Sequence, residues 1–397
     1  MRVLQAHNFY QFAGGEDAVV SNEQELLLDH GNEVRLYSVS NDEIKGLSRK
    51  IHVAWQASYS PSSKAQVSRE ITAFGPDVVH VHNFFPLISP SIYDACHQAG
   101  VPVVQTLHNY RSICPAAILL REGRLCEDCV HGTAYQAVQH ACYRGSRLAS
   151  LAVARMVDVH RRKGTWRNKV DRFIALTRFA KTKFVEAGFP ENKIAIKPNF
   201  VKVRGASGTE DAKSNGALFV GRLSAEKGIR TLLKAWSSLD VPLQIVGDGP
   251  LLETVCEQQT EIIVSLGSKA PDEVATEMKN ASFLVMPSEC YEAFGLTIVE
   301  AFSQALPVIA SRLGAMAEIV EDGVTGLHFT PGDPNDLAAK VRWAAKHPEK
   351  MRRMGLNARQ VYEEKYTPEL NYRQLISIYE MAIDQYAKHN TGPDIPG

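Results

Sequence analysis

The 397-residue chain contains no long hydrophobic run, because no window reaches the ~18 uninterrupted apolar residues that a membrane-spanning helix needs. It also lacks net charge: 44 basic residues balance 44 acidic ones, so no global attraction to nucleic acid or acidic lipid is predicted. The first residues, Met1–His7, lack the apolar core of a signal peptide and are typical of a strand. With seven cysteines, an odd number, and no export signal, we expect a cytoplasmic protein with reduced thiols.

Two short motifs are absent as well. The chain has no Asp-x-Asp sequence, and its first strand-to-helix turn, with Gly14 and Gly15, is not a GxGxxG dinucleotide fingerprint. Two adjacent glycines still permit a left-handed backbone and close approach by a ligand, although such a pair is common in ordinary turns. No basic stripe interleaved with aromatic residues is present, so nucleic acid is not expected as a partner.

What the chain does contain is the composition of an ordinary globular protein, 45% hydrophobic and 22% charged. Its length suggests two domains, each with a core of its own. Short apolar segments alternate with helical patterns throughout, which predicts a parallel α/β architecture. The predicted strands are residues 2–6, 34–39, 78–81, 101–107, 173–176, 194–196, 217–220, 243–246, 261–264, 282–286, 308–310 and 326–329.

The domain organisation follows from a repeat and a change of composition. Both halves of the chain begin as strand, glycine turn, helix and strand, and residues 202–216 between them are rich in Gly, Ser, Lys and acidic residues. We therefore predict two Rossmann-like domains, 1–198 and 217–368, that face each other across a cleft and are joined by a linker over 199–216. Helical apolar spacing after residue 367 predicts a long C-terminal helix, which with the tail makes up residues 369–397.

The most informative segment is Ser288–Ala301, in which Glu292 and Glu300 lie eight residues apart. An apolar strand precedes the pair and a helical pattern follows, so a helix beginning near Phe294 would offer free backbone N–H groups to an anion. Carboxylates suit paired hydroxyls, and together these groups match the hydroxyls and phosphates of a nucleotide-sugar. On a generic helix, however, such a glutamate pair is usually a solvated face.

Two further segments carry candidate binding residues. Gly221–Gly228 follows a strand, and its Arg222 and Lys227 are placed to converge on a diphosphate, the arginine through its planar fork and the lysine as a point charge. The alternative is a capped helix start with exposed charges. His108 follows another predicted strand, where ligands of open α/β sheets bind, although a histidine there is often structural.

These motifs resemble those of the retaining GT-B glycosyltransferases of family 4, the glycosyltransferases group 1. The resemblance rests on the Glu-x7-Glu pair, the Gly-Arg…Lys-Gly element and a Gly-Asp-Gly-Pro turn at residues 247–250, and it covers almost the full chain. It implies a GT-B fold whose C-terminal helix crosses back to the first domain. It also implies transfer of a sugar from a UDP- or GDP-linked donor to a hydroxyl of a saccharide or lipid-linked acceptor, in cell-surface glycan synthesis.

The resemblance assigns roles to the nucleotide-binding residues. Arg222 and Lys227 would hold the donor phosphates and Glu300 the ribose. The backbone of the turn between the two glutamates would also face the phosphates; this turn is Phe294, Gly295, Leu296 and Thr297.

It also assigns roles near the sugar and in catalysis. Glu292 and His108 would hold the donor sugar as the catalytic pair, and the loop with Gly14 and Gly15 would close over the donor. Because the chain has no Asp-x-Asp, no metal or other cofactor is expected for catalysis, and the departing phosphate would take the proton of the acceptor.

Two other functional classes stay open. A sugar-nucleotide epimerase of the same architecture would need acid or base groups on both faces of one sugar, and it would turn over the donor without an acceptor. A non-catalytic nucleotide-sugar-binding subunit would be expected if one of the motif positions were lost, and all of them are present.

Four cysteines occupy what we interpret as an insertion over about residues 109–145. They are Cys114, Cys126, Cys129 and Cys142, with the spacing C-x11-C-x2-C-x12-C. A CxxC pair flanked by two more cysteines can supply a tetrahedral thiolate site, which predicts a structural zinc. Free thiols packed in a loop are the main alternative, His131 and His140 compete as ligands, and a disulfide is least expected in the cytoplasm.

The segment 144–172 has a strong local charge, with nine basic residues against two acidic ones. Part of it has amphipathic helical spacing. This combination predicts contact with an anionic membrane surface, and hence a peripheral location on the inner face of the membrane. The alternative is a solvated helix that packs against the domain core.

Overall fold

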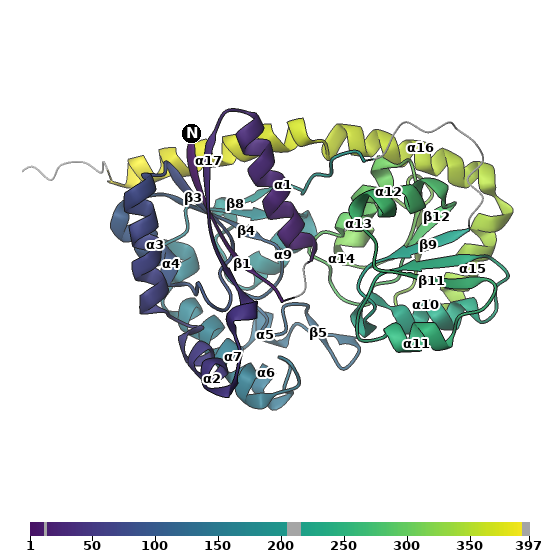
Figure 1. Cartoon of the computed structure of the whole chain (residues 1–397), viewed down its shortest axis with the longest axis horizontal. Coiled ribbons are helices and arrows are strands. Elements are labelled where there is room, and N and C mark those ends of the chain that lie inside the picture. Colours follow the sequence, from purple (N-terminus) through teal and green to yellow (C-terminus); the bar gives the residue numbers. More distant parts are fainter. Residues whose placement is uncertain (12–13, 205–215, 391–397) are drawn as a thin grey trace, which may run out of the picture. The chain divides into compact units, whose positions relative to one another are not determined.

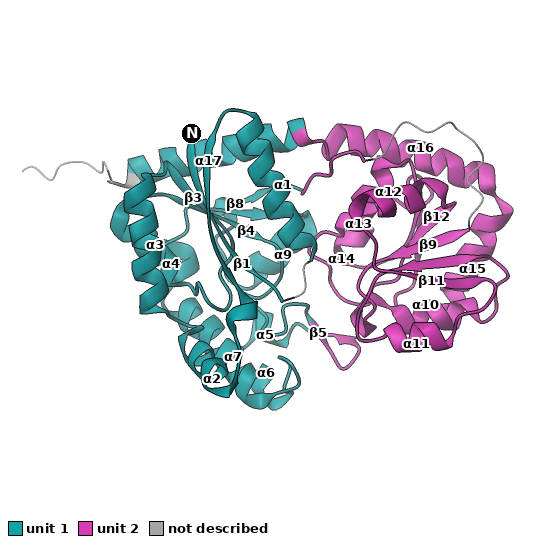
Figure 2. Ribbon diagram, viewed as in Figure 1, with its two compact units in different colours: residues 1–119, 126–198, 369–397 teal, residues 120–125, 199–368 magenta. Residues whose placement is uncertain are grey.

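The computed structural model describes residues 1–11, 14–204 and 216–390, which divide into two compact units (Figure 2). Unit 1 comprises residues 1–119, 126–198 and the chain from 369 onward, and unit 2 comprises 120–125 and 199–368. The division therefore falls at 198 and 368, where the sequence analysis ended its domains. Residues 120–125 differ, since they group with unit 2, and most of the predicted linker (205–215) lies outside the described residues.

Unit 1 contains a six-stranded sheet in which every strand pairing is parallel. Its strands run in the order β2-β1-β3-β4-β7-β8, and all six correspond to predicted strands with small shifts at their ends. The two central strands, β3 and β4, are buried along their whole length, which explains their continuous apolar character. The strands are β1 (Arg2–Phe9), β2 (Glu33–Ser40), β3 (Val78–Asn83), β4 (Val103–Leu107), β7 (Arg172–Ala175) and β8 (Ile194–Ile196).

Helices pack around this sheet, and the C-terminal helix is one of them (Figure 1). Tyr379 of that helix lies 2.7 Å from Nδ1 of His80 on β3, which confirms that the chain returns to its first domain as predicted. The helices of unit 1 are α1 (Gly15–Asp29), α2 (Leu47–Gln56), α3 (Pro61–Phe74), α4 (Ser91–Ala99), α5 (Asp128–His131), α6 (Gln136–Gln139), α7 (Arg147–Arg162), α8 (Thr165–Asn168), α9 (Arg178–Glu186) and α17 (Pro368–Asn390).

Residues 120–125 form a small hairpin of β5 (Leu120–Arg121) and β6 (Arg124–Leu125). Its two turn residues, Glu122 and Gly123, both have positive φ, at 51° and 74°. Two left-handed residues in succession twist the chain in the sense that antiparallel strands require, so the glycine favours this turn.

Unit 2 contains a second parallel sheet of six strands, in the order β11-β10-β9-β12-β13-β14. Its first strand, β9, pairs with β10 on one side and with β12 on the other, which is the doubly wound order of nucleotide-binding folds. All six strands were predicted. They are β9 (Ala217–Val220), β10 (Leu243–Val246), β11 (Ile263–Gly267), β12 (Phe283–Met286), β13 (Val308–Ser311) and β14 (Gly326–Phe329).

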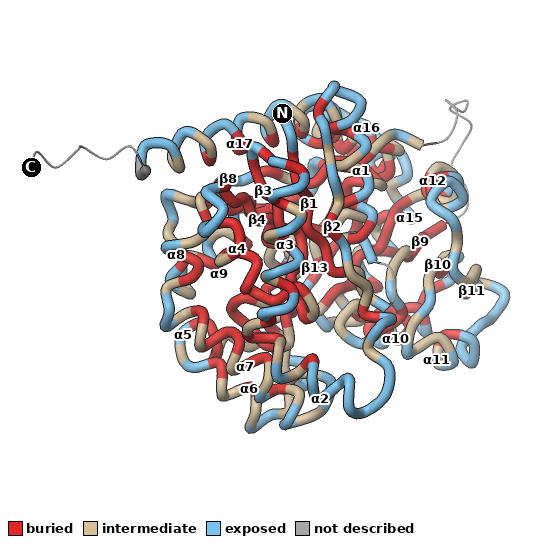
Figure 3. The backbone as a smooth tube through the Cα atoms, turned by 60° about the vertical axis from the view of Figure 1, so that its left-hand side comes forward, coloured by how far each residue is buried: buried red, intermediate tan, exposed pale blue. Residues whose placement is uncertain are grey.

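The helices of unit 2 bury their apolar sides against this sheet. Trp236, Leu337 and Val341 of two helices pack with Phe219 and Phe283 of the strands in one core. Figure 3 shows the buried residues concentrated along the strands and the exposed ones on outer helices and loops. The helices are α10 (Ile229–Trp236), α11 (Leu252–Glu257), α12 (Pro271–Asn280), α13 (Leu296–Ser303), α14 (Gly314–Ile319), α15 (Pro334–Lys346) and α16 (Pro348–Lys365).

Each sheet reverses its strand order at one point, between β1 and β3 in unit 1 and between β9 and β12 in unit 2. Ligands of open α/β sheets bind at the carboxyl ends of the strands beside such a point. Gly14 follows β1, residues 221–227 follow β9, and Glu292 follows β12, so the predicted motifs lie at these positions. No helix in the described part of the chain combines the length and apolarity needed to cross a membrane.

Candidate functional site

The turn after β9 and the loop after β12 are packed together at the reversal point of unit 2. Gly228 has a φ of +73°, and a Cβ at this position would lie 1.9 Å from the carbonyl oxygen of Pro287. Only glycine allows such a close approach. The contact brings Lys227 beside the loop after β12, where its Nζ lies 2.5 Å from Oε1 of Glu292.

The pairing of Lys227 with Glu292 is the main departure from the predicted layout. The sequence analysis placed the lysine on phosphate and the glutamate on sugar, whereas the structure joins them in an ion pair. Burial opposes the charge of the lysine, but the Glu292 carboxylate outweighs it and raises the pKa of Lys227. Ser288, which the sequence analysis did not assign, donates to the same carboxylate oxygen at 2.8 Å.

Arg222 differs from Lys227 in having no partner of its own. Its side chain is exposed, and its guanidinium makes no hydrogen bond or ion pair with any residue in the described ranges. An unpaired planar fork beside the reversal point is suited to bind a phosphate through two N–H groups.

The helix between the two glutamates begins later than predicted. It starts at Leu296 rather than near Phe294, because Gly295 adopts a φ of +93° and caps it. Phe294 is buried instead, with its ring 6.0 Å from that of Tyr366. Glu300 is therefore the fifth residue of α13, a little more than one turn from its start rather than two. Burial raises the pKa of Glu300, and nearby Arg204 opposes this effect.

In unit 1, His108 directly follows β4 and contacts a second histidine. Its Nε2 lies 3.0 Å from Nδ1 of His82, and the two rings are stacked with centroids 5.3 Å apart. Burial, with His82 alongside, lowers the pKa of His108 well below its usual range, so the imidazole is neutral. The ring lines a small hollow beside the ends of β3 and β4 together with Asn83, Phe85, Asn109, Arg111 and Ser112.

The first turn of α1, which follows the loop after β1, contains a buried carboxyl group that the sequence analysis missed. Gly14, whose φ is −131°, is extended, and a Cβ there would meet no atom within 4 Å, so its backbone does not require glycine. Gly15 is the first residue of α1. Glu16 accepts hydrogen bonds from Tyr10 (3.3 Å) and Asn109 (3.2 Å), and burial raises its pKa to about 8.

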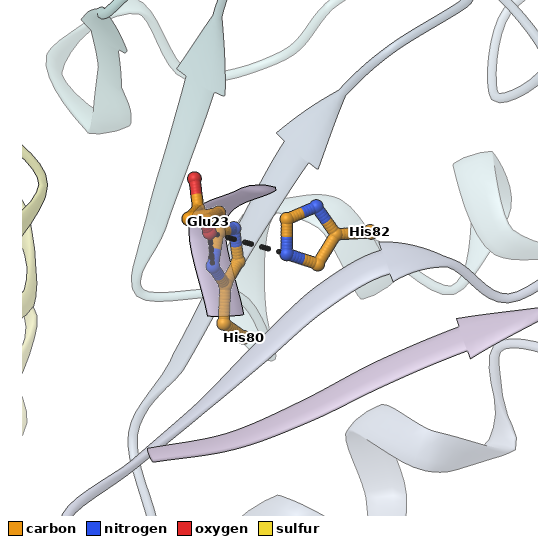
Figure 4. Close-up of side chains that lie close together, drawn as sticks. All are labelled: Glu23, His80 and His82. Atoms are coloured by element: carbon orange, nitrogen blue, oxygen red, sulfur yellow. Dashed lines mark ion pairs between the residues drawn. The ribbon is translucent and has the colours of Figure 1, made fainter. Parts of the chain in front are cut away.

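Among the described residues, two groups of three side chains bring potential metal ligands within 4.8 Å of one another. One is the exposed set Glu127, His131 and Glu186, and the other is the buried set Glu23, His80 and His82 (Figure 4). In the buried set, Nζ of Lys197 lies 3.3 Å from Oε2 of Glu23 and supplies the positive charge that this carboxylate needs. A divalent cation would have to share a buried site with this ammonium group, so the set does not fit a metal.

The four cysteines of the insertion lie close enough to affect one another. Burial, together with a smaller effect of Cys114, Cys126 and Cys142, raises the pKa of Cys129 to about 12. The structure describes no disulfide at any of the four, and their sulfurs do not form one of the described groups within 4.8 Å. Arg161 of α7 holds the CxxC segment by donating to the carbonyl oxygens of Gly132, at 2.6 Å, and Cys129, at 2.9 Å.

Much of the basic segment 144–172 packs against unit 1 or forms ion pairs within it. One side of α7 is buried, with Val153, Met156 and Val157 on it, which agrees with the packed-helix alternative, whereas Leu148 and Leu151 are exposed. Arg162 pairs with Asp158 at 2.8 Å, and Lys169 pairs with Asp94. The basic residues of this segment that remain exposed are Arg144, Arg147, Arg162, Lys163 and Arg167.

Comparisons with known proteins agree with this architecture. A family model described as Glycosyltransferase Family 4 matches residues 13–204, and one described as Glycosyl transferases group 1 matches residues 205–361. The two matches are consecutive and cover most of the chain. The chain belongs to the group 1 glycosyltransferases of the GT-B fold.

Individual relatives show how far the similarity extends. An uncharacterized glycosyltransferase of Methanocaldococcus jannaschii is 35% identical over 174 residues, 43% of this chain and 49% of the relative, so the match spans about half of that protein. The alpha-D-kanosaminyltransferase of Streptomyces kanamyceticus is 25% identical over 334 residues, 80% of this chain and 79% of the relative.

Solved structures show the same fold. HepE of Anabaena, crystallised with UDP, has a TM-score of 0.68 at 19% identity, and the match covers 96% of this chain and 100% of that one. A sucrose-phosphate synthase of Thermosynechococcus elongatus has a TM-score of 0.72 at 17% identity and covers 96% and 99%.

Proposed function

We propose that the chain is a retaining glycosyltransferase that moves a sugar from a UDP- or GDP-linked donor to a hydroxyl of a saccharide or lipid-linked saccharide, in cell-surface glycan synthesis. The reversal point of unit 2 is the observation that carries this proposal. There, the free guanidinium of Arg222, the ammonium of Lys227 and the N-terminus of α13 supply positive charge and N–H donors for a diphosphate. Glu300, further along α13, supplies a carboxylate for the ribose hydroxyls.

The comparisons support the class of donor. Structures of HepE from Anabaena contain UDP, UDP with glucose, and UDP-glucose, and the curated relatives include a GDP-mannose-dependent mannosyltransferase of Corynebacterium glutamicum. We infer that Glu292 of unit 2 contacts the donor sugar, exchanging part of its ion pair with Lys227 for a sugar hydroxyl. In unit 1, we infer that His108 offers a neutral imidazole to a substrate hydroxyl.

Catalysis without a divalent metal is part of the proposal. The charge that develops on the leaving diphosphate is then stabilised by Arg222, Lys227 and the first N–H groups of α13, all fixed before the reaction begins. Turnover measured after chelation with EDTA is expected to remain unchanged, and a loss that added magnesium or manganese restores would contradict this part of the proposal.

The activity is tested with a panel of nucleotide-sugars and one variant. Thermal shift identifies the donor, because a ligand that binds the native state raises its apparent stability. Glu292→Gln keeps the size of the side chain but removes its charge, and we expect turnover to fall at least about tenfold while binding of the free nucleoside diphosphate changes little. Normal turnover with weakened nucleotide binding would contradict the placement of Glu292.

The same assay separates the alternatives. An epimerase would convert the donor without any acceptor, and a binding subunit would bind it without turnover. Saccharide acceptors with and without a lipid diphosphate are supplied in parallel, so that the acceptor class is determined in the same experiment.

We also infer that the enzyme works in the cytoplasm on an anionic membrane, through a surface formed by α2 and α7. Leu47, Ile51 and Trp55 lie four residues apart along α2, on one face, with exposed fractions of 74%, 63% and 72%. Val53 is the one buried residue of this helix. Three large apolar side chains in a row on a helix that contributes so little to the core indicate a partner outside the chain.

Helix α7 extends this surface. The guanidinium of Arg155 lies over the ring of Trp55, at 4.8 Å, and Leu148 and Leu151 share the face of α7 that carries Arg155. The two helices lie side by side in Figures 1 and 3. Exposed basic residues lie in or directly before these two helices: Lys45, Arg49, Lys50, Arg144 and Arg147.

An anionic bilayer fits this combination better than a purely apolar partner does. A tryptophan ring suits the headgroup level of a membrane, and each basic residue near an anionic surface contributes ~1 kcal/mol of attraction. Screening limits that attraction to about 8 Å at physiological ionic strength, so binding should weaken with salt.

Co-sedimentation with anionic and with zwitterionic vesicles tests this surface. We expect binding to anionic vesicles at low salt, and its loss in the double variant Ile51→Ser with Trp55→Ser. Leu356→Ser is the matched control, since Leu356 is an exposed apolar residue of unit 2. Equal vesicle binding by the two variants would contradict the membrane proposal. So would a wild-type chain that does not bind anionic vesicles and forms dimers instead.

A further inference from the structure

A row of buried polar side chains extends from His108 into the centre of unit 1. Nδ1 of His82 faces His108, and Nε2 of the same ring lies 3.2 Å from Oε1 of Glu23 (Figure 4). Glu23 is 1% exposed and His82 is 3% exposed. The second carboxylate oxygen of Glu23 faces Lys197, whose Nζ also donates to Asn371 of α17 at 2.9 Å.

The contacts within this row determine which of its side chains are charged. Burial alone would raise the pKa of Glu23, but His80 and Lys197 outweigh it and hold that pKa well below its usual value, so the carboxylate is ionised. Burial, reinforced by His80, lowers the pKa of His82 to about 3, so its ring is neutral. A neutral imidazole carries one N–H, and its other nitrogen accepts.

The position of each proton then follows from geometry. Nε2 of His82 is assigned the hydrogen, because a bare nitrogen 3.2 Å from the ionised carboxylate of Glu23 would bring two lone-pair-bearing atoms together. Its Nδ1 is therefore an acceptor, and Nε2 of His108 must donate to it across 3.0 Å. The amide nitrogen of Gln5 lies 3.4 Å from the same carboxylate oxygen and 3.5 Å from Nε2 of His82. The contact of Nε2 with the ionised carboxylate is shorter, at 3.2 Å, and the carboxylate can accept from both nitrogens, so it decides the assignment.

We propose that Glu23 and His82 are positioning residues that hold His108 in the Nε2–H tautomer and leave its Nδ1 as a hydrogen-bond acceptor for a substrate hydroxyl. A buried carboxylate commonly sets the tautomer and orientation of a histidine through the nitrogen that the ligand does not use, and here a second histidine transmits the effect. The substrate hydroxyl rests on the proposed function, whereas the tautomer does not.

The row also explains why these residues are buried. Glu23 comes from α1, His80 and His82 come from β3, Lys197 follows β8, and a hydroxyl from α17 reaches His80. Each buried polar group finds a partner on another element, so the histidine ring at the end of the row is held in a fixed orientation.

Nitrogen NMR of the full chain with labelled histidines measures the tautomer directly. We expect His108 and His82 to show neutral Nε2–H signatures, with no titration between about pH 6 and 8. His82→Asn places an oxygen near the former Nδ1 and should keep the His108 signature, whereas His82→Leu removes the acceptor and should abolish it. His160→Leu is the matched control, because His160 is a buried histidine of unit 1 with separate partners, Thr165 and Ser58.

Kinetics extend the test to turnover. With the donor identified, His82→Leu should lower kcat by about tenfold or more, His82→Asn should restore most of it, and nucleotide affinity should stay unchanged in both. An Nδ1–H signature for His108 in the wild-type chain would overturn the proposal. So would a His82→Asn variant that folds but loses the Nε2–H signature. If the tautomer is as stated but no nucleotide-sugar binds, the proposed function fails and the positioning role stands.

Discussion

Arg222 and Lys227 are expected to contribute differently to nucleotide binding, because one is free and the other is already paired. Charge-assisted contacts to phosphate contribute ~1.5–3 kcal/mol, so Arg222→Ala should weaken binding of the nucleoside diphosphate by about tenfold to a hundredfold. Calorimetric titration measures this, with Arg222→Lys as the variant that keeps the charge but loses the fork. Removing both Arg222 and Lys227 with no loss of affinity would contradict the phosphate site.

Lys227→Ala should have a second effect that Arg222→Ala lacks. It leaves Glu292 partly buried without its cation, although Ser288 still donates to the carboxylate. We therefore expect the lysine variant to lower the thermal stability of the chain, whereas the arginine variant should not, since Arg222 is exposed and its guanidinium makes no hydrogen bond or ion pair with a described residue.

Glu16 predicts a dependence of stability on pH. Its pKa is about 8 in the folded chain against an ordinary value of 4.5, so the folded state holds one more proton between these limits. The contribution of this carboxyl group to the free energy of unfolding is complete below its pKa in the unfolded chain and is lost as pH rises through its pKa in the folded chain. Between these two pKa values, stability falls by about 1.4 kcal/mol per pH unit. Glu16→Gln cannot ionise, so it should melt higher than the wild-type chain at about pH 9 but not near pH 5.

Thermal melts of both proteins across this range provide the measurement. Other groups titrate in both proteins, so the difference between them isolates Glu16. A difference that does not change with pH would mean that the carboxyl is ionised in the folded chain, and that Tyr10 and Asn109 stabilise the anion.

At the scale of elements, the inner strands could be predicted because they are buried on both faces of their sheet. A strand buried on both faces needs a continuous apolar run, and that run is visible in the sequence whatever it pairs with. The site motifs were visible for a related reason, since each lies in the short loop directly after such a strand. The start of α13 was placed too early, because Gly295 adopts a left-handed conformation and caps the helix, which begins at Leu296.

The contacts between these loops could not be predicted in the same way. Lys227 and Glu292 are 65 residues apart, and they meet because β9 and β12 are neighbours in the sheet. Glu23, His82 and His108 come from three elements, and each alone resembles an ordinary buried or exposed polar residue. Only the strand order brings them together, and sequence patterns carry little information about that order.

The cysteine insertion gives a prediction at this scale. Four thiols near one another, without a disulfide, suit a closed tetrahedral zinc site of structural type. Purified protein made in zinc-replete, reducing conditions should then contain about one zinc per chain, and Cys129→Ser should reduce this content and lower the thermal stability.

Cys96→Ser is the control for the zinc experiment, since Cys96 is a buried thiol of α4 outside the insertion. It should leave the zinc content unchanged. Elemental analysis that finds no metal in the wild-type chain would identify the four residues as free thiols. Nucleotide binding should be unaffected in either case, because the phosphate residues belong to unit 2.

At the scale of the whole molecule, two cores predict two separable stabilities. The nucleotide site lies in unit 2, while α17 is bonded to unit 1 through Asn371 and Tyr379. A nucleoside diphosphate at a hundred times its dissociation constant should stabilise unit 2 by ~2.7 kcal/mol, which at about 2–4 °C per kcal/mol for a unit of this size is a shift of about 5–11 °C. Tyr379→Ala should instead lower the transition of unit 1, since it removes a fully buried ring and leaves Nδ1 of His80 with one partner fewer.

Differential scanning calorimetry of the full chain distinguishes the two effects. We expect the ligand to move one transition upward and the Tyr379→Ala variant to move the other downward, with the ligand shift retained in the variant. Met381→Ala is the control on the same helix, because Met381 is 40% exposed and its loss should cost little. A single transition that ligand and variant both displace would show that the two cores unfold together, and the stability of the His108 row in unit 1 would then depend on nucleotide bound in unit 2.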